Sequence, residues 1–578
     1  MADLERKNYS EDYTDNYEGA IPNTRGFNFI RTVGYSRDDL VNKPVIGIAN
    51  AWSDVVPGHN NLRQVAEAVK RGIYMAGGIA AEYGVSGVCD AAVNEYVLPT
   101  RDVICDSIEL ETMNQHFDGL VMIGSCDKIV PGMIMAACRM KDVLPSLIVT
   151  GGPALLGRPF KGKTVIEFEF RKEMLKGLQN GSIKREAVAP ISDCGMVTCG
   201  ACCYYGTANT MSAITEAIGL QLPSGGTIPA VFYERLILAE ESGKAIVNLV
   251  KNGKKGRDIL TFEALQNAIA VLMATGGSTN GVLHTLAIAN ELELDPDAII
   301  HEFEIQSKKV PVITAIYPEG PESNPTETFH YAGGVPRVFE YLNKAGLINP
   351  NVLTVSGKTL GENIKEHIYV YQGDWSDVIR PADNPFSKEG GLAILRGNLA
   401  PDTAVCKPAA FPENCKVFTG PAICFENAEE ADAAIADGTV KAGHVMVIRN
   451  EGPRGGPAMR EMAMPLKNLI HAGLGDKVLY ITDGRFSGTN NGAFVGHICP
   501  EAAAGGPIAL VKDGDIITID TYKNSLTIDV NEEEFAKRRS VWKPRKLNLR
   551  GYLARYVELV SGANRGCILV PPSRQKTE

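Results

Sequence analysis

Long apolar runs, an excess of positive charge and a targeting segment are all missing from this sequence of 578 residues. No apolar stretch approaches the roughly 20 residues that span a bilayer, so we expect no association with a membrane. The net charge of −10 argues against a nucleic-acid-binding surface. The first residues, MADLERKNYSEDYTDNYEG, have neither the apolar core of a signal peptide nor the arginine-rich face of a transit peptide. We therefore expect a cytoplasmic protein.

The thirteen cysteines do not follow the pattern of a secreted or electron-carrying protein. In a long cytosolic chain they are more typical of free thiols and metal ligands than of a disulfide framework. A ferredoxin-type redox carrier needs four closely spaced cysteines per cluster, whereas most of these are scattered. Cys199 and Cys202 form a CxxC pair, but no second pair lies at zinc-ribbon spacing.

Two further motifs point to functions that their context does not support. GRPFKGKT (157–164) fits the Walker A string, yet it contains Pro159 and runs into VIEFEF, an alternating strand pattern, where a P-loop would open a helix. KRRSVWKPRK (537–546) is basic, but in an acidic protein it is more typical of a solvated surface or a subunit contact.

The first half of the chain alternates short apolar strands with amphipathic helices. Strand patterns occupy PVIGIAN (44–50), DGLVMIGSC (118–126) and SLIVTGG (146–152). Apolar residues at helical spacing predict a helix from Leu62 to Ile73, and Ala268 to Leu292 reads as a long helical region interrupted by TGGSTNG. This alternation predicts an α/β fold with a parallel sheet and ligand loops at the carboxyl ends of its strands.

The pattern of the sequence changes beyond about residue 385, from alternating strands and helices to mostly strands. VMVIRN (445–450), KVLYITDG (477–484) and IALVKDGDIITID (508–520) are rich in β-forming residues and separated by glycine turns. We therefore predict two domains, residues 1–385 with an α/β fold and residues 386–578 with a β-barrel-like fold.

GSCDKIVPG (124–132) is the most informative stretch of the sequence. Its apolar strand delivers Cys126, Asp127 and Lys128 into one loop, which places a soft thiolate beside a hard oxygen ligand. ACCYYGTANTM (201–211) presents Cys202 at the mouth of another small-residue segment. Thiolates suit iron–sulfur clusters and carboxylates suit magnesium, so the pattern indicates an enzyme that uses both.

Five motifs together resemble one enzyme family. They are GSCDKIVPG, ACCYYGTANTM, ATGGSTNGVLH (274–284), NEGPRGGPAMREM (450–462) and TDGRFSG (482–488). In this order and spacing they resemble the dihydroxy-acid dehydratase and 6-phosphogluconate dehydratase family, which includes sugar-acid dehydratases. The resemblance implies an α/β N-terminal domain, a C-terminal β-barrel domain, and assembly as a homodimer or homotetramer.

The resemblance also assigns ligands to this sequence. Cys126 and Cys202 match cluster thiolates, and Asp127 matches a ligand of Mg²⁺. Lys128 matches a lysine that is carbamylated in related enzymes and then binds the same metal, and Glu451 matches a further magnesium ligand.

The cluster type depends on a glycine. Gly58 stands where members with a [2Fe-2S] cluster usually carry a cysteine, so the resemblance favours a [4Fe-4S] cluster. The segment VCDA (88–91) supplies Cys89 as the third thiolate. Spare candidates for this third position are Cys194, Cys199 and Cys203.

Asp90 would be the remaining magnesium ligand. The loop that follows it is shorter than in most relatives, so a competing alignment puts Val85 at the metal position. Valine offers no oxygen ligand, and we therefore expect Asp90.

The resemblance implies dehydration of a 2,3-dihydroxycarboxylic acid to a 2-keto-3-deoxy acid, with Ser487 as the base that removes the α-proton. We expect a sugar acid as the substrate, because CDKIVPG, YYGTAN and the VCDA strand end resemble the sugar-acid branch of the family. Asn490 and Asn491 are either ligands for extra hydroxyl groups or turn residues. The alternative is the dihydroxy-acid dehydratase of branched-chain amino-acid synthesis, acting on 2,3-dihydroxyisovalerate. A non-catalytic descendant that binds a sugar acid also stays open, because the assignment of Asp90 has a competitor.

Overall fold

The computed structural model describes residues 31–90, 96–115, 117–159, 174, 176–318, 324–487 and 492–571. Most of the Walker-like string and the alternating segment after it lie outside the described residues. Asn490 and Asn491 also lie outside them.

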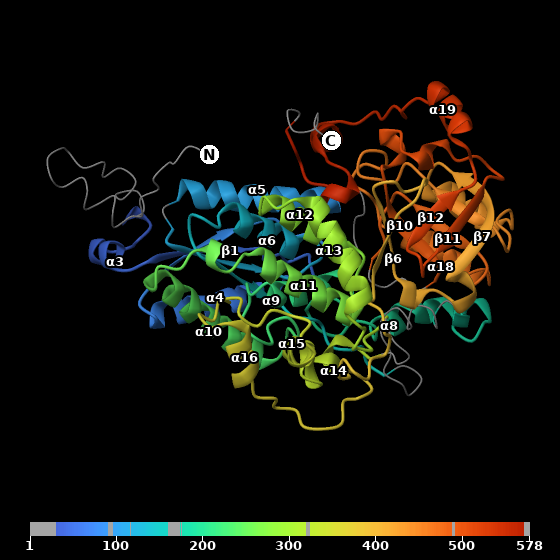
Figure 1. The fold of residues 1–578 in the computed structure, drawn as a ribbon. Helices are drawn as coiled ribbons and strands as arrows, with labels where there is room; N and C mark the ends of the chain where they lie inside the picture. Colours follow the sequence, from blue (N-terminus) through green and yellow to red (C-terminus); the bar gives the residue numbers. More distant parts are fainter. Residues whose placement is uncertain are drawn as a thin grey trace.

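A parallel sheet of four strands forms the centre of the N-terminal part (Figure 1). Its order is β2 (Ile79–Gly84), β1 (Val45–Asn50), β3 (Gly119–Gly124) and β4 (Ser146–Thr150), with every neighbouring pair parallel. Strands β1, β3 and β4 are buried along their whole length, which explains their uninterrupted apolar sequences. The three strands expected from the sequence are confirmed, and β2 at the edge is an addition.

Helices cover both faces of this sheet. Helix α4 (Leu62–Met75) and helix α10 (Tyr233–Lys251) lie on one face, and α5 (Val97–Asn114) and α6 (Ile129–Arg139) lie on the other (Figure 1). The first two helices cross at Gly72 and Gly243, where a Cβ atom on Gly72 would lie 1.8 Å from the carbonyl oxygen of Glu240. The close crossing therefore requires glycine.

The interrupted helical region is two helices, as the sequence indicated. Helix α11 (Phe262–Thr275) ends at Gly276, whose φ of 58° is the left-handed conformation that favours glycine. Helix α12 (Asn280–Glu291) begins four residues later and is buried over most of its length. The polar insert between them thus places Ser278, Thr279 and Asn280 inside the molecule.

The C-terminal part contains a mixed sheet of eight strands. Its order is β12 (Ser525–Ile528), β11 (Ile516–Asp520), β7 (Val417–Phe425), β8 (Val445–Ile448), β9 (Leu479–Thr482), β10 (Phe494–Cys499), β6 (Thr403–Cys406) and β5 (Ala393–Leu395). The two ends approach each other, because Arg396 after β5 forms a backbone bridge with Ser525 in β12. The sheet is nearly closed, and the predicted α/β fold with a barrel-like C-terminal part is confirmed. The boundary after residue 385 stays a prediction.

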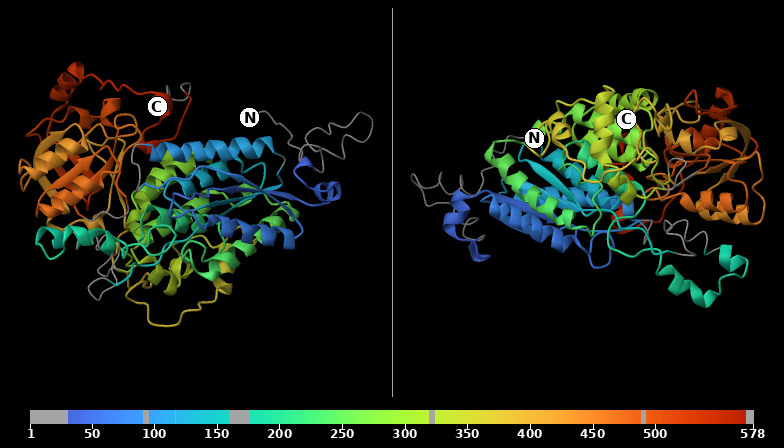
Figure 2. Two further views of the ribbon diagram at one scale, coloured as in Figure 1. Left: turned by 180° about the vertical axis from the view of Figure 1, so that it is seen from behind. Right: turned by 90° about the horizontal axis from the view of Figure 1, so that it is seen from below.

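Further helices complete the described structure. They are α3 (Arg37–Asn42), α8 (Val188–Ser192), α9 (Thr207–Ala217), α13 (Pro296–Lys309), α14 (Thr326–Tyr331), α15 (Gly334–Lys344), α16 (Leu360–Glu366), α17 (Ala428–Ala436), α18 (Ala463–His471), α19 (Glu532–Val541) and α20 (Gly551–Leu559). Figure 2 shows the two sheets at opposite ends of the molecule in both further views. Among the helices of the described ranges, none combines the length and apolar character needed to cross a membrane.

Candidate active site

Three cysteines meet at the carboxyl edge of the parallel sheet. Cys89 follows β2, and Cys126 lies two residues beyond the end of β3. Cys202 reaches the same edge because Ala201 forms a parallel bridge with Pro153, just after β4, and donates its N–H to Gly152 over 2.9 Å. The chain reverses its direction across the sheet between β1 and β3, which is where open α/β sheets bind ligands.

The three thiols influence one another strongly. The pKa of Cys126 lies well above its ordinary value because its thiol hydrogen-bonds with Cys89, is buried, and lies near Cys202 and Asp90. Thiolates crowded in this way repel one another, so they are unfavourable unless a cation compensates their charge. Three cysteine sulfurs gathered at one point are the donor set of an iron–sulfur centre. Cys89 and Cys202 are the cysteines among the leading causes of the raised pKa of Cys126.

The spare candidates for the third thiolate are not among the leading causes of the raised pKa of Cys126. Cys194 packs against Met174 and Ile183 in a separate apolar cluster. Burial is the leading cause of the raised pKa of Cys199, and Cys203 is buried with its carbonyl accepting the N–H of Thr326.

Gly58 and His59 hold the loop of Cys126 from the side of β1. A Cβ atom on Gly58 would lie 2.9 Å from the sulfur of Cys126, so the glycine leaves room for that thiol. His59 accepts the N–H of Cys126 at Nε2 over 3.1 Å, and its Nδ1 lies 2.6 Å from the carbonyl oxygen of Ala51. Burial lowers the pKa of His59 to about 4, so the ring is neutral and Nδ1 carries the proton.

An acidic group lies beside the thiols. Carboxylate oxygens of Asp90, Asp127 and Glu461 all lie within 4.8 Å of one another, as the ligands of a metal ion would. Asp90 directly follows Cys89, and Asp127 directly follows Cys126, so two neighbouring pairs link the sulfur and oxygen ligands. The arrangement fits a hard divalent cation beside an iron–sulfur cluster.

Two buried cations lie against the acidic group. The Lys128 ammonium contacts Asp127 and lies 3.2 Å from Asp90 Oδ2. The Arg485 guanidinium contacts Glu461 and donates to Asp90 Oδ2 with both terminal nitrogens, each over 3.3 Å. Three carboxylates therefore face two positive side chains, which leaves a negative charge for a further cation.

Burial and neighbouring charges set the protonation of the group. Burial raises the pKa of Glu461, although Arg485 opposes this shift. Burial also acts to raise the pKa of Asp90, but Lys128 and Arg485 outweigh it and hold that pKa below its usual value. Burial and the charge of Arg485 lower the pKa of Lys128 to about 8, so part of this lysine is a neutral amine near neutral pH.

The structure places Glu451 outside the acidic group, contrary to the sequence prediction. Its carboxylate accepts the N–H of Ala428 at the start of α17 over 3.0 Å and pairs with Arg460 over 2.8 Å. Those two bonds reach Oε1, and Arg460 Nε donates to the other oxygen, Oε2, over 3.1 Å, so both oxygens are held by local partners. Glu461, ten residues on, lies in the acidic group instead. Asp90 lies in that group, whereas its competitor Val85 packs against the main apolar core.

Ser487 lies on the loop after β9, half-buried and two residues beyond Arg485. The loop is held against α12, because the hydroxyl of Thr279 donates to the carbonyl oxygen of Phe486 over 2.8 Å. The structure thus brings the TDGRFSG loop to the acidic group through Arg485. The catalytic role of Ser487 stays a prediction.

Four residues at the site were not assigned from the sequence: Glu461, Arg485, Asn280 and His284. All four lie within motifs that the sequence did single out. Asn280 donates to Glu461 over 3.0 Å, and His284 Nε2 lies 3.8 Å from Asp127 Oδ1. Their residue types carry metal-site chemistry, but the direction in which each side chain points depends on the packing of two distant chain segments.

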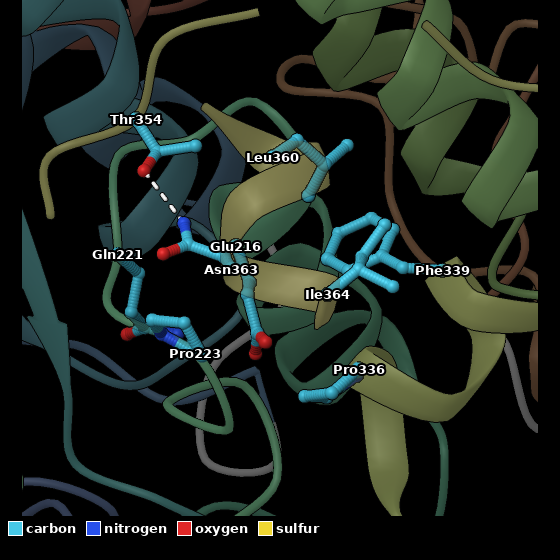
Figure 3. Close-up of a pocket in the computed structure, with 9 residues that line it drawn as sticks. All are labelled: Glu216, Gln221, Pro223, Pro336, Phe339, Thr354, Leu360, Asn363 and Ile364. Carbon is cyan, nitrogen blue, oxygen red and sulfur yellow. Dashed lines mark hydrogen bonds between the residues drawn. The ribbon is translucent and has the colours of Figure 1, made fainter. Parts of the chain in front are cut away.

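A small cavity of about 20 Å³ lies elsewhere, between α9, α15 and α16 (Figure 3). Figure 3 shows Thr354 hydrogen-bonded to Asn363, at 2.9 Å, beside the apolar side chains of Leu360 and Ile364. Glu216 also lines it, and backbone N–H groups of residues 224 and 226 bind that carboxylate. None of the thiols or carboxylates of the candidate site lines this cavity.

Comparison with known proteins gives the family. The N-terminal model of the dihydroxy-acid/6-phosphogluconate dehydratase family matches residues 43–363, and its C-terminal model matches residues 377–567. The chain belongs to this family, a family of dehydratases, which are hydro-lyases.

Individual relatives cover almost the whole chain. A dihydroxy-acid dehydratase of Pyrococcus furiosus is 47% identical over 544 residues, which are 93% of this chain and 96% of the relative. A dihydroxy-acid dehydratase of Halothermothrix orenii is 45% identical over 532 residues, 91% of this chain and 94% of the relative. A dihydroxy-acid dehydratase of Agathobacter rectalis is 42% identical over 568 residues, 97% of this chain and 99% of the relative.

Proposed function

We propose that this chain is a dihydroxy-acid dehydratase that converts 2,3-dihydroxyisovalerate, or a close homologue, to the 2-keto acid. The observation that carries the proposal is the pairing of three thiols with three carboxylates through the adjacent residues Cys89–Asp90 and Cys126–Asp127. The choice of substrate follows the names of relatives that are 42% to 47% identical over more than nine tenths of this chain.

This choice replaces the sugar acid expected from the sequence with the alternative substrate, 2,3-dihydroxyisovalerate. Asn490 and Asn491 lie outside the described residues. The sensor hypothesis depended on losing a metal ligand at Asp90, and Asp90 lies within the acidic group.

The chain provides two ligand sets for this chemistry. Asp90, Asp127 and Glu461 would hold Mg²⁺, together with Lys128 after carbamylation. Cys89, Cys126 and Cys202 would hold a [4Fe-4S] cluster, because Gly58 provides no further thiolate. When bound, the two centres supply Lewis acidity toward the carboxylate and the two hydroxyl groups of the substrate.

Lys128 has the environment that carbamylation needs. Carbon dioxide reacts with a neutral amine, and the lowered pKa of about 8 gives this lysine a larger neutral fraction than an ordinary lysine has. The product is an anion with oxygen ligands. It would turn a cation that competes with Mg²⁺ into a ligand for it.

Ser487 would take the proton from C2 of the substrate. A serine hydroxyl is too weakly acidic to act as a base in water, but an adjacent divalent cation lowers the pKa of such a group by many units. Loss of the C2 proton and of the C3 hydroxide removes one water and leaves an enol, which tautomerises to the 2-keto acid. We also propose the division at residue 385, and a homodimer or homotetramer as the working assembly.

Anaerobic turnover after cluster reconstitution with Mg²⁺ tests the proposal. The substrates are 2,3-dihydroxyisovalerate, an aldonate and 6-phosphogluconate, each followed by 2-keto acid formation. We expect the highest kcat/KM for 2,3-dihydroxyisovalerate, and no turnover by Ser487→Ala with its cluster absorbance intact. Preference for an aldonate would overturn the choice of substrate, and absence of any keto acid from a loaded enzyme would overturn the dehydratase assignment.

A further inference from the structure

His284 connects the acidic group to a fully buried arginine. The imidazole is inaccessible to solvent, with Nε2 3.8 Å from Asp127 Oδ1 and Nδ1 3.3 Å from the guanidinium of Arg101. Within the described part of the chain, Nε2 makes no hydrogen bond. The ring thus lies between a candidate metal ligand and a permanent cation.

Arg101 decides which nitrogen of His284 carries the proton. A guanidinium has five N–H donors and no acceptor, so it can contact Nδ1 favourably when that nitrogen offers its lone pair. The proton of the ring then resides on Nε2, on the side of Asp127. The contact of Nδ1 with Arg101 therefore makes Nε2–H a hydrogen-bond donor that points toward the acidic group.

We infer that Arg101 is a positioning residue that fixes the Nε2–H tautomer of His284, and that His284 thereby orients Asp127 for the divalent cation. The inference rests on the proposed function, since it takes Asp127 to be a ligand of that cation. A short movement of the Asp127 carboxylate would bring its oxygen within hydrogen-bonding distance of Nε2–H. A donor behind a metal-bound carboxylate holds the direction in which its other oxygen points.

The position of Arg101 is itself fixed from two sides. Its second terminal nitrogen donates to the carbonyl oxygen of Cys567 over 2.8 Å and to Asp102 over 3.2 Å. Asp102 in turn accepts the N–H of Leu569 over 3.3 Å. The Arg101–Asp102 pair therefore fastens residues 567–569 of the C-terminal segment to α5, and this attachment leaves one guanidinium nitrogen directed at His284.

Two substitutions of His284 distinguish the roles of its two ring nitrogens. The amide nitrogen of glutamine reaches the place of Nε2 and can still donate to Asp127, whereas asparagine reaches the place of Nδ1 and cannot. We expect His284→Gln to bind Mn²⁺, used as a probe for Mg²⁺, within about threefold of the unchanged enzyme. His284→Asn should bind it about 10- to 100-fold more weakly. The measurement is free Mn²⁺ by electron paramagnetic resonance, on full-length protein with its cluster reconstituted.

A double-mutant cycle tests whether Arg101 acts through His284. Arg101→Met should weaken Mn²⁺ binding about tenfold, Arg101→Lys should restore it, and Arg101→Met should add nothing in the His284→Asn background. Arg235→Met is the matched control, because Arg235 is equally buried and donates to backbone carbonyls of residues 150, 225 and 228. This control should leave the Mn²⁺ affinity of the site unchanged.

The outcomes separate the inference from the proposed function. Additive effects of Arg101→Met and His284→Asn, or equal Mn²⁺ affinities of the glutamine and asparagine variants, would overturn the inference while the metal site stands. If the unchanged enzyme binds no Mn²⁺, the proposed function fails and the inference fails with it.

Discussion

The hydroxyl of Thr279 donates to the carbonyl oxygen of Phe486 over 2.8 Å, although the two residues lie 207 positions apart in the chain. Thr279 is the residue that precedes α12, and Phe486 precedes the predicted base Ser487. The next residue, Asn280, donates to Glu461 over 3.0 Å. The start of α12 therefore holds both C-terminal loops against the ligands that the parallel sheet presents.

We predict that Thr279→Val lowers kcat with little change in the metal or cluster content. Valine has a similar volume but leaves the buried carbonyl of residue 486 without its donor, which costs about 1–3 kcal/mol and allows the loop of Ser487 to move. This corresponds to a loss of about 5- to 150-fold in rate if the whole cost falls on the reacting geometry. Thr279→Ser keeps the hydroxyl and should keep most of the activity. Equal rates for the two variants would contradict the prediction.

Glutamate-to-glutamine substitutions at residues 461 and 451 should have different consequences. Glu461→Gln removes one of three clustered carboxylates. We expect its affinity for Mg²⁺ to fall about 10- to 100-fold, so that less Mg²⁺ stays bound after desalting. Glu451→Gln weakens the pair with Arg460 and the contact with the start of α17. It should lower the free energy of unfolding by about 1–3 kcal/mol while Mg²⁺ stays bound.

Metal analysis and thermal unfolding on the same preparations check this pair. Loss of Mg²⁺ from the residue 451 variant, with retention in the residue 461 variant, would reverse our assignment and restore the sequence prediction.

The rate at which Lys128 is carbamylated should rise with pH. Its pKa is lowered to about 8 by burial and by Arg485, and the reactive species is the neutral amine. At fixed carbon dioxide, the rate should therefore increase about tenfold per pH unit below pH 8 and level off above it. Incorporation of ¹³C from labelled bicarbonate into metal-free protein, followed by NMR, measures the rate. A rate that is flat between pH 6 and 8 would contradict the assigned environment, and Lys128→Arg is the control without a reactive amine.

Much of the fold follows from local sequence patterns. The buried strands β1, β3 and β4 are continuous apolar runs, and α4 begins at Leu62 as its spacing predicts. Strand β2 was missed because only its first two residues are buried, while the other four residues of Ile79–Gly84 alternate between partly buried and exposed positions. The other edge strand, β4, is buried along its whole length and therefore shows the continuous apolar run that β2 lacks.

Some of the candidate ligands were identified from the sequence and one was not. The family resemblance grouped Cys89, Cys126 and Cys202, and in the structure each of them follows a strand or bridge at one edge of the sheet. Glu461 could not be chosen over Glu451 from the sequence, because both lie in one glycine-rich loop. Ala458 and Met459 in that loop have positive φ values of 79° and 53°, and this reversal turns the later glutamate toward the site.

We predict a pH dependence of stability from Glu501. Burial, with the nearby charge of Asp483, raises its pKa to about 7. A carboxyl group whose pKa is higher in the folded state contributes stability at pH values below its ordinary pKa of 4.5, and that contribution disappears as the pH rises through 7. The shift corresponds to a contribution of about 3 kcal/mol. The unchanged protein should therefore lose stability between pH 5 and pH 8, and the Glu501→Gln variant should not show this loss.

Denaturant unfolding of cluster-free protein measures this effect as the difference between variant and unchanged protein. That difference should move in favour of the glutamine variant as the pH rises. A constant difference from pH 5 to pH 8 would show that Glu501 does not titrate in this range.

The most direct test of the account is the location of the two metals in crystals of the reconstituted, Mn²⁺-loaded enzyme. Anomalous scattering at the iron and manganese edges distinguishes them. The account predicts an iron peak enclosed by Cys89, Cys126 and Cys202, and a separate manganese peak between Asp90, Asp127 and Glu461. An iron peak at Cys194 or Cys199, or manganese bound by Glu451, would contradict it.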